Sequence, residues 1–314
     1  MSTHLVVYSS PDVLLTLTSD TGATFPVSMP AEASIDAAFL ATWLYGKSEK
    51  TQRAYTSDMH KFYQCLGLSL ERVKLEDFHT FIDSLAPLKP ASRARAIATI
   101  KSALSFGVKT GYLKVNIGTV VKLPKLEDKL AERIMSEQAV ARLLALETHT
   151  RNHAILALLY RAGLRAHELC NLQWRNLVER DQAGQLAIFG KGKKTRFVLL
   201  DEETWQELAS LKPAHVSPDT YVFQSRQARS RIGETQHRMD ESMIYLIVSR
   251  AAKRAGIQGR VSPHWMRHAY ATHSIENGAP IPFVKEVLGH ASIETTAKYM
   301  HVRPNVASGK YLKV

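Results

Sequence analysis

The spacing of apolar residues along this 314-residue chain changes from a strand-like to a helical period near position 36. Before it, short β-favouring runs at Leu5 to Tyr8 and Val13 to Leu17 alternate with Ser, Pro, Asp and Gly. After it, apolar side chains recur every three or four residues up to position 123, as on the buried face of a helix. The pattern predicts an accessory segment at 1–35 and a bundle of about four helices at 36–123. The residues that define the bundle are Phe39, Leu40, Trp43, Tyr55, Met59, Phe62, Tyr63, Ile97, Ile100, Leu104 and Val108.

A charged stretch interrupts the helical pattern at residues 122–133. It contains Pro124 and has no apolar period, so we expect an extended linker at 124–133. Beyond it, Ser136 predicts the N-cap of a new helix, and a second apolar helix follows at 155–160. The chain therefore predicts two domains, the helical bundle and a second domain at 134–304, followed by a C-terminal tail at 305–314.

The second domain also contains the clearest strand pattern in the chain. Residues 185–189 and 195–200 are strand-like, and the Gly-Lys-Gly-Lys-Lys sequence between them favours a hairpin. Residues 221–223 could add a third strand. The expected fold class is mainly α with a small β-sheet, an α+β fold.

The charge of the chain favours a polyanionic partner. Lys and Arg number 41 against 29 Asp and Glu, which gives a formal net charge of +12. Residues 84–126 contain no acid, and among their basic residues Arg93, Arg95 and Lys101 are candidates for contact with DNA. Such a surface would bind phosphates with salt-dependent affinity. The alternative is a basic protein with no such partner.

The cysteines and the apolar runs bear on the compartment. Cys65 and Cys170 are the only cysteines, and their spacing fits neither a metal site nor a redox site. No signal-peptide pattern and no apolar run near 18 residues occurs in the sequence. We therefore expect a cytoplasmic protein, associated with the nucleoid, with no export and no membrane span.

The sequence Ser-Pro-His-Trp-Met-Arg-His at 262–268 predicts the start of a helix, with proline in its first turn. His264 and Arg267 then share one helix face, so that a proton-transfer group and an anion clamp are neighbours. His264 and His268, four residues apart, could alternatively hold a metal ion. However, the HExxH pattern is absent and no third ligand is evident, so we expect no zinc site.

Two short helices should follow. Glycine at 278 permits a left-handed exit from the first helix, and the prolines at 280 and 282 open a second helix that runs to Gly289 and His290. Ser292 predicts the cap of a last helix, which carries Tyr299. The apolar residues Phe283, Val284, Val287 and Leu288 are expected in the core.

Six residues resemble, in order and spacing, the signature of the tyrosine recombinases, the phage integrase and Xer-type family. The first arginine lies in Ala-Gly-Leu-Arg-Ala-His-Glu-Leu at 162–169, the lysine in Gly-Lys-Gly at 190–192, and the second arginine in His-Trp-Met-Arg-His at 264–268. The last histidine follows Leu-Gly, and the tyrosine comes nine residues later. The likeness covers residues 134–302, is weaker in the helical bundle and is absent from 1–35. The six residues are Arg165, Lys191, His264, Arg267, His290 and Tyr299.

The resemblance implies a helical core-binding domain and a catalytic domain that form a C-shaped clamp on DNA. It also implies that Tyr299 attacks a DNA phosphate and stays linked to it as a 3′-phosphotyrosine, which stores the bond energy for rejoining. Arg165 and Arg267 would hold the phosphate, because guanidinium forks bind such oxygens bidentately and stabilise the transition state. Neither a metal nor ATP is then expected as a cofactor.

The remaining roles also come from the resemblance. Lys191 is the expected general acid for the 5′-oxygen, although the nearby Lys193 and Lys194 leave its identity open and are themselves candidates for DNA contact. His264 is expected to be the general base for Tyr299 or a proton shuttle. His290 is expected to donate a hydrogen bond to the phosphate.

The implied partners are double-stranded DNA with a specific recombination site and three further copies of the chain. Four protomers on two sites would exchange strands through a Holliday junction, and the tail at 305–314 would dock on a neighbouring protomer.

Taken singly, each of the six residues could be a surface ion pair, a turn residue or a core aromatic. Two other functions stay open: a DNA-binding protein on the same scaffold that does not cut, and a type IB topoisomerase. The sequence leaves open the target site and the choice between integration, excision, dimer resolution and inversion.

Overall fold

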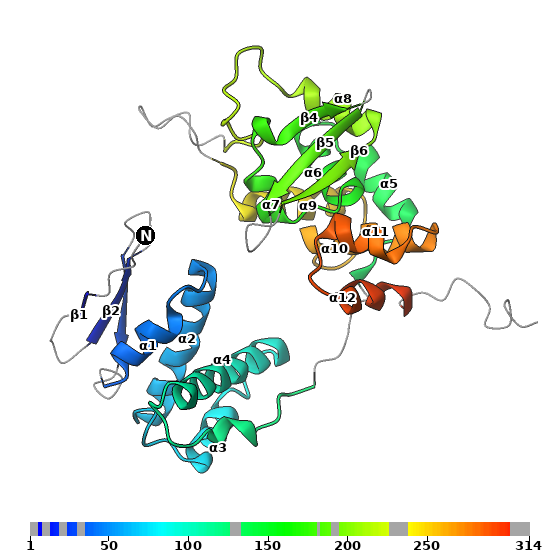
Figure 1. Ribbon diagram of the computed structural model, residues 1–314. Coiled ribbons are helices and arrows are strands. Elements are labelled where there is room, and N and C mark those ends of the chain that lie inside the picture. Colours follow the sequence, from blue (N-terminus) through cyan, green and yellow to red (C-terminus); the bar gives the residue numbers. More distant parts are fainter. Residues whose placement is uncertain are drawn as a thin grey trace, which may run out of the picture. The chain divides into compact units, whose positions relative to one another are not determined.

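The computed structural model describes residues 6–7, 13–18, 24–29, 35–125, 133–180, 183–189, 195–225 and 238–301. The chain divides into two compact units, Met1–Glu127 and Asp128–Val314, and each unit is described here by itself (Figure 1). None of the helices within these ranges is long and apolar enough to cross a membrane.

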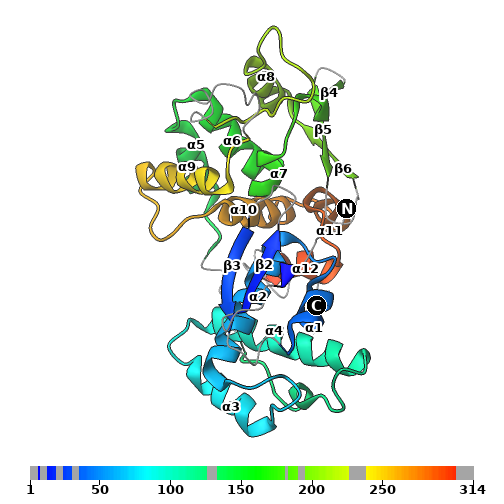
Figure 2. The same cartoon turned by 90° about the vertical axis from the view of Figure 1, so that its left-hand side faces the viewer.

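The first unit begins with a three-stranded antiparallel sheet in the order β1-β2-β3 (Figure 2). Its strands are β1 (Val6–Val7), β2 (Val13–Thr18) and β3 (Thr24–Met29). The apolar pattern indicated the first two strands but not the third, which contains Pro26 opposite Thr16. Proline lacks the N–H that a central strand needs, and β3 accommodates it because it is an edge strand.

Four α-helices follow the sheet in the described part of the first unit. They are α1 (Ala37–Leu44), α2 (Glu49–Leu66), α3 (Leu75–Ser84) and α4 (Pro90–Lys109), followed by the 3-10 turn η2 (Ile117–Thr119). The four-helix prediction is confirmed for residues 37–109. Ser48 caps α2 by accepting from the backbone N–H of Thr51, and Gly67, with a φ of 60°, ends it.

Two carboxylates are buried in this bundle and tie its parts together. Asp36 accepts from the hydroxyls of Tyr63 at 2.7 Å and Tyr112 at 2.5 Å. Asp58 on α2 accepts from Arg95 on α4 at 2.5 Å. Burial raises the pKa of Tyr63 and Tyr112, and the neighbouring Asp36 raises it further. The phenols therefore stay protonated and act as donors to Asp36.

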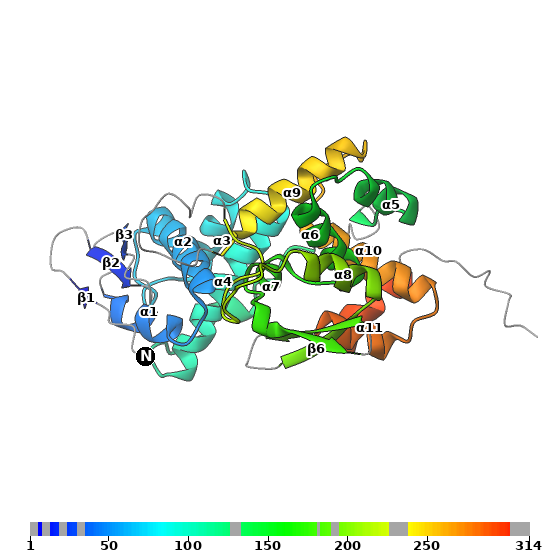
Figure 3. The same ribbon diagram turned by 90° about the horizontal axis from the view of Figure 1, so that it is seen from above.

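The second unit packs helices against one face of an antiparallel sheet (Figure 3), and the strand order of this sheet is β4-β5-β6. Its sheet faces the core with Leu186, Ile188, Val198 and Leu200. The elements are α5 (Glu137–Ala145), α6 (Thr150–Arg161), α7 (Ala166–Cys170), η4 (Trp174–Asn176), β4 (Leu177–Arg180), β5 (Ala183–Phe189), β6 (Thr195–Leu200), α8 (Glu202–Ser210), α9 (Glu241–Arg254), α10 (Pro263–Glu276), α11 (Ile281–Leu288), α12 (Ile293–Ala297) and η6 (Lys298–His301).

The predicted hairpin is present, with Phe189 of β5 paired to Thr195 of β6. The third strand was predicted wrongly, because β4 takes this place and Tyr221 forms only an isolated bridge to Gln173. The prediction that Phe283 lies in the core was also wrong, since its side chain is 54% exposed. The buried face of α11 carries residues 284, 287 and 288, at the i, i+3, i+4 spacing of one helix face.

Candidate active site

Three guanidinium groups converge on the C-terminal end of α11. The last carbonyl oxygens of a helix have no partner within it. Here the carbonyls of residues 287, 288 and 289 accept from Arg196, Arg267 and Arg165, respectively. The distances are 2.7 Å for Arg196 and 3.3 Å for Arg165. The helix dipole favours cations at this end, so α11 gathers the three charges.

A single buried carboxylate, Glu168 at the start of α7, holds two of these guanidiniums. It accepts from both Nη atoms of Arg196 at 2.8 Å, and from the backbone N–H and Nη1 of Arg165 at 2.7 and 3.0 Å. Burial would raise the pKa of Glu168, but the hydrogen bond and charge of Arg196, helped by Arg165, lower it to about 2. Glu168 is therefore ionised at neutral pH and orients both arginines.

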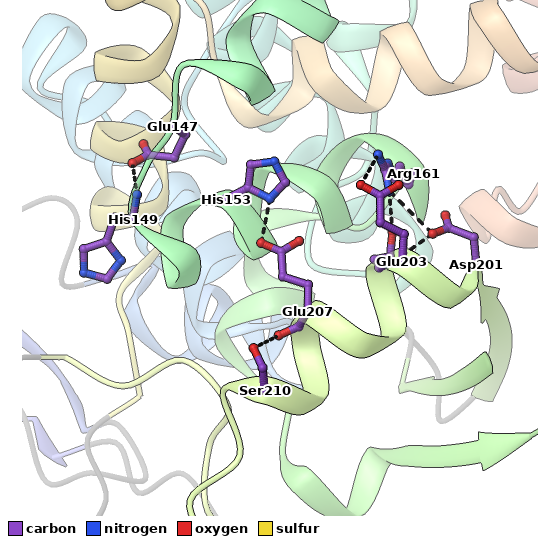
Figure 4. A network of polar contacts seen from close by, with 9 residues as sticks. Glu147, His149, His153, Arg161, Asp201, Glu203, Glu207 and Ser210 are labelled. Carbon is purple, nitrogen blue, oxygen red and sulfur yellow. Dashed lines mark hydrogen bonds and ion pairs between the residues drawn. The ribbon is translucent and has the colours of Figure 1, made fainter. Parts of the chain in front are cut away.

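Replacing Glu168 with Gln should lower the free energy of unfolding by about 3 kcal/mol, because two cations lose their buried counter-charge. Urea unfolding at pH 7 measures this change. The matched control is Glu203→Gln in the exposed contact between Arg161 and Glu203 (Figure 4), where we expect a loss of at most about 1 kcal/mol. Equal losses in the two variants would contradict the buried role of Glu168.

Arg267 is the most deeply buried of the three cations, with 4% of its surface exposed. It donates to the carbonyls of Gly163 and Leu288. Gly163 has a φ of 59°, and a Cβ there would come within 2.8 Å of the Tyr270 ring, so glycine is required at this turn. Burial, followed by the Arg165 charge, lowers the pKa of Arg267 to about 9. Arg267 therefore stays charged at neutral pH, and a bound anion would stabilise this charged form.

Tyr299 lies beside this cluster, on η6. It is 6% exposed and belongs to a small apolar cluster with Ala271, Val284 and Leu288. Its phenol oxygen lies 2.6 Å from Nδ1 of His268. Ser292 caps α12 as predicted, but that helix ends at Ala297 and Tyr299 occupies the 3-10 turn that follows.

Two further imidazoles complete the site. Nδ1 of His290 lies 2.8 Å from the hydroxyl of Thr296, and its ring stacks with that of Tyr299 at 6.4 Å. Burial, with the charges of Arg267 and Arg165, lowers the pKa of His290 from the ordinary 6.5 to about 4. The same causes lower the pKa of His264, which keeps part of its surface exposed. Both imidazoles are therefore neutral at pH 7.

The lowered pKa of His290 predicts acid sensitivity. Its pKa is lower in the folded chain than in the unfolded chain, so its contribution to stability is complete above pH 6.5 and is lost as the pH falls toward 4. His290→Asn should therefore lose less unfolding free energy than the wild type between pH 7 and pH 4. Urea unfolding across this range measures it, with the exposed His215→Asn as control. Parallel curves for wild type and His290→Asn would contradict the assignment.

Five of the six predicted catalytic residues lie in the described part of the chain, and the structure brings them together. Arg165, Arg267 and Tyr299 surround the end of α11, with His264 and His290 beside them. Lys191, and with it Lys193 and Lys194, lies outside the described residues. Strand β6 contributes Arg196 to the site.

Arg196 and His268 are two site residues to which the sequence analysis assigned no role. A signal for Arg196 was present, because it alternates with Val198 and Leu200 on the inward face of β6, where an arginine requires a partner. His268 lies four residues after His264 and so shares its helix face. From the sequence, that pair was considered only as a metal site.

The residues predicted for DNA contact on α4 differ in their surroundings. Arg95 binds the buried Asp58, and Lys101 donates to the carbonyl of Val121. These contacts give both cations a part in holding the first unit together. For Arg93, as for the other two, contact with DNA stays a prediction.

The site combines three guanidiniums and one carboxylate with a buried phenol held by an imidazole. Its net positive charge suits an oxyanion with several free oxygens, such as a phosphodiester. A phenol oxygen is one of the groups that can act as a nucleophile toward such a centre. Fold and site together define an enzyme class: proteins that transfer phosphoryl groups through a tyrosine.

Comparisons with known proteins agree with this class. The model of the phage integrase family matches residues 129–305. The tyrosine recombinase XerC of Thermodesulfovibrio yellowstonii is 30% identical over 273 residues, covering 82% of this chain and 87% of the relative. The tyrosine recombinase XerD of Neisseria meningitidis serogroup B is 30% identical over 285 residues, covering 86% and 94%.

Solved structures share the fold. A lambda integrase dimer bound to a COC′ core site matches with a TM-score of 0.67 and 17% identity, over 88% of this chain and 96% of its own. XerH bound to its difH substrate in a pre-cleavage complex matches with a TM-score of 0.63 and 18% identity, over 85% of each chain.

This chain belongs to the phage integrase family, the tyrosine recombinases. The family and the mainly helical fold class with a small sheet, as predicted from the sequence, are confirmed. So is the predicted activity, that of a site-specific recombinase that transfers DNA strands.

Proposed function

We propose that this chain recombines two copies of a specific double-stranded DNA site, cutting each strand through Tyr299 and rejoining it from a 3′-phosphotyrosine by way of a Holliday junction. The observation that carries the proposal is the phenol of Tyr299, held at 2.6 Å by His268 next to three guanidiniums. A phosphodiester bound there would contact both a nucleophile, the phenol, and the positive charge of the guanidiniums.

The residues divide the chemistry among them. Arg165 and Arg267 hold the phosphate and stabilise the charge that grows on its oxygens in the transition state. His290 donates a hydrogen bond to the phosphate, and Lys191 protonates the 5′-oxygen as it leaves. His264 is the general base for Tyr299 or a proton shuttle. This distribution of roles needs neither a metal nor ATP.

We also propose how the chain is organised on DNA. The helical bundle at 36–123 is the core-binding domain and residues 134–304 are the catalytic domain. The linker at 124–133 joins them into a C-shaped clamp, and the tail at 305–314 docks on a neighbouring protomer. Four copies act on two sites in the cytoplasm, at the nucleoid. The difH substrate bound to XerH in its solved complex supports a DNA site as partner.

Strand exchange between two sites is the direct test. DNA fragments of the source genome that the purified protein retains first identify the site. A plasmid with two copies of this site should then give recombinant products when the protein is added without metal or ATP. Relaxed plasmid without recombinants would favour a type IB topoisomerase, and binding with no change in the plasmid would favour a protein that does not cut.

The basic surface of α4 predicts a change in the salt dependence of binding. Arg93→Gln should weaken DNA binding to all sequences alike and reduce the slope of log affinity against log salt by about 1, because one phosphate contact is lost. Fluorescence anisotropy between about 50 and 200 mM salt measures the slope. The control is Arg53→Gln on α2, in the exposed pair with Glu49, which should keep the wild-type slope. An unchanged slope in Arg93→Gln would remove this residue from the interface.

A further inference from the structure

We propose that His268 is a further catalytic residue, whose imidazole positions the phenol of Tyr299 and receives its proton as the phenol oxygen attacks. The inference rests on the proposed function, because it assigns a step of the same cleavage reaction. It also decides between the two roles left open for His264, which then acts as the shuttle.

The geometry of the pair supports this assignment. The distance of 2.6 Å between Nδ1 of His268 and the phenol oxygen of Tyr299 is at the short end of the hydrogen-bond range. Their ring centres lie 5.7 Å apart at an angle of 42°. Such contact places an imidazole nitrogen next to the reacting atom.

Both partners are held from outside the pair. His268 follows Arg267 on α10, and the guanidinium of Arg267 is fixed by two backbone carbonyls. Tyr299 comes from η6 and is packed against the apolar residues of α10 and α11. The hydrogen bond therefore joins two separately anchored elements, so it fixes the direction in which the phenol oxygen points.

The neighbouring imidazoles are less suited to receive this proton. Nδ1 of His290 already lies 2.8 Å from the Thr296 hydroxyl, and the lowered pKa of His290, about 4, makes it a weak base. Burial and the charges of Arg267 and Arg165 also lower the pKa of His264. His264 on α10 and Tyr299 on η6 have rings next to that of His268, and the charge of His268 also acts on His290.

The proton balance of the step is complete. Phenols are largely protonated at neutral pH, so attack requires a base. The bond from the phenol oxygen to phosphorus forms as the O–H bond breaks, and the proton moves to the lone pair on Nδ1 of His268, which this step uses in the tautomer with hydrogen on Nε2. The bond from phosphorus to the 5′-oxygen breaks, and this oxygen takes a proton from Lys191. In rejoining, the 5′-hydroxyl gives its proton back to Lys191 as its oxygen bonds to phosphorus. The bond from phosphorus to the Tyr299 oxygen breaks, and the His268 imidazolium returns its proton to this oxygen.

A nicked duplex with sulfur in place of the bridging 5′-oxygen isolates this step, because a thiolate leaves without a proton from an acid. The duplex carries the site identified from the genomic DNA fragments that the purified protein retains. The rate of covalent adduct formation is measured for the wild type, His268→Asn and the control His215→Asn, which makes the same substitution at an exposed histidine outside the site. We expect His268→Asn to be at least about 100-fold slower near pH 7 on both the sulfur and the oxygen substrate, since asparagine accepts a hydrogen bond but not a proton.

The pH dependence separates proton transfer from positioning. In His268→Asn the rate on the sulfur substrate should rise about tenfold per pH unit up to pH 9, because hydroxide must then remove the phenol proton. The wild type and His215→Asn should level off at lower pH. The proposal would be overturned if His268→Asn formed the adduct at a rate within about threefold of the wild-type rate, or if its rate had the same pH profile as that of the wild type.

Folding and DNA affinity are checked by thermal melting and by binding to an unnicked duplex. His268→Gln is the second variant if His268→Asn does not fold, and the same rate and pH criteria apply to it. A wild-type protein that forms no adduct on any selected site would instead count against the proposed function, so the two failures are distinguishable.

Discussion

The variant Tyr299→Phe should form no detectable covalent adduct with a nicked duplex that carries the selected site. The substitution removes one oxygen atom, the proposed nucleophile, and leaves the ring in its apolar cluster. We expect the rate of adduct formation to fall by at least about 10⁴-fold, as for other enzymes that lose a nucleophile. Denaturing gel electrophoresis of the labelled duplex measures the adduct.

The control for Tyr299→Phe is Tyr160→Phe, which also removes a phenol oxygen from a tyrosine–histidine pair. The Tyr160 hydroxyl lies 2.9 Å from Nδ1 of His273. Both variants should lose about 1 kcal/mol of unfolding free energy and keep DNA affinity within about threefold of the wild type. Only Tyr299→Phe should lose the adduct. Adduct formation by Tyr299→Phe at the wild-type rate would refute the assignment of the nucleophile.

Arg267→Lys should slow adduct formation by about 100- to 1000-fold. The guanidinium of Arg267 donates to the carbonyls of Gly163 and Leu288 through different Nη atoms, which fixes its plane. A planar guanidinium can bind two phosphate oxygens at once. Lysine keeps the charge but offers a single ammonium group. The transition state should therefore lose more stabilisation than the bound substrate, so DNA affinity should change by at most about threefold.

The control for Arg267→Lys is Arg175→Lys, in the exposed ion pair with Asp219 at 2.7 Å. It makes the same chemical change and should leave the rate within about twofold of the wild type. Single-turnover rates at saturating protein give the comparison. If Arg267→Lys cleaved as fast as Arg175→Lys, the buried cation would have no part in the chemistry.

The elements around the site follow local rules, and the sequence predicted them well. Glycine at 289, with a φ of 61°, ends α11 as expected, and Ser136 caps α5 through the N–H of Ala139. Side-chain spacing also predicted the hairpin of β5 and β6. These features depend on a few neighbouring residues, and the order of the chain shows them directly.

Features that depend on distant residues were harder to predict. The bond between His268 and Tyr299 spans 31 positions, and Arg196 meets Glu168 across 28. No periodicity relates such residues. The resemblance to the tyrosine recombinases predicted a common site in this part of the chain, but it did not predict these contacts. The assignment of Tyr299 to the last α-helix was wrong for a different reason. Helix α12 ends two residues before Tyr299, which lies in the 3-10 turn that follows, and helix ends often tighten in this way.

The central claim is that the phenol of Tyr299 becomes covalently linked to DNA, and mapping the linked residue tests it most directly. The wild-type adduct on the nicked duplex is digested with nuclease and protease, and the peptide that retains a nucleotide is sequenced by mass spectrometry. The account predicts a nucleotide 3′-phosphate on Tyr299. A nucleotide on another residue, or a linkage through the 5′-phosphate, would contradict it.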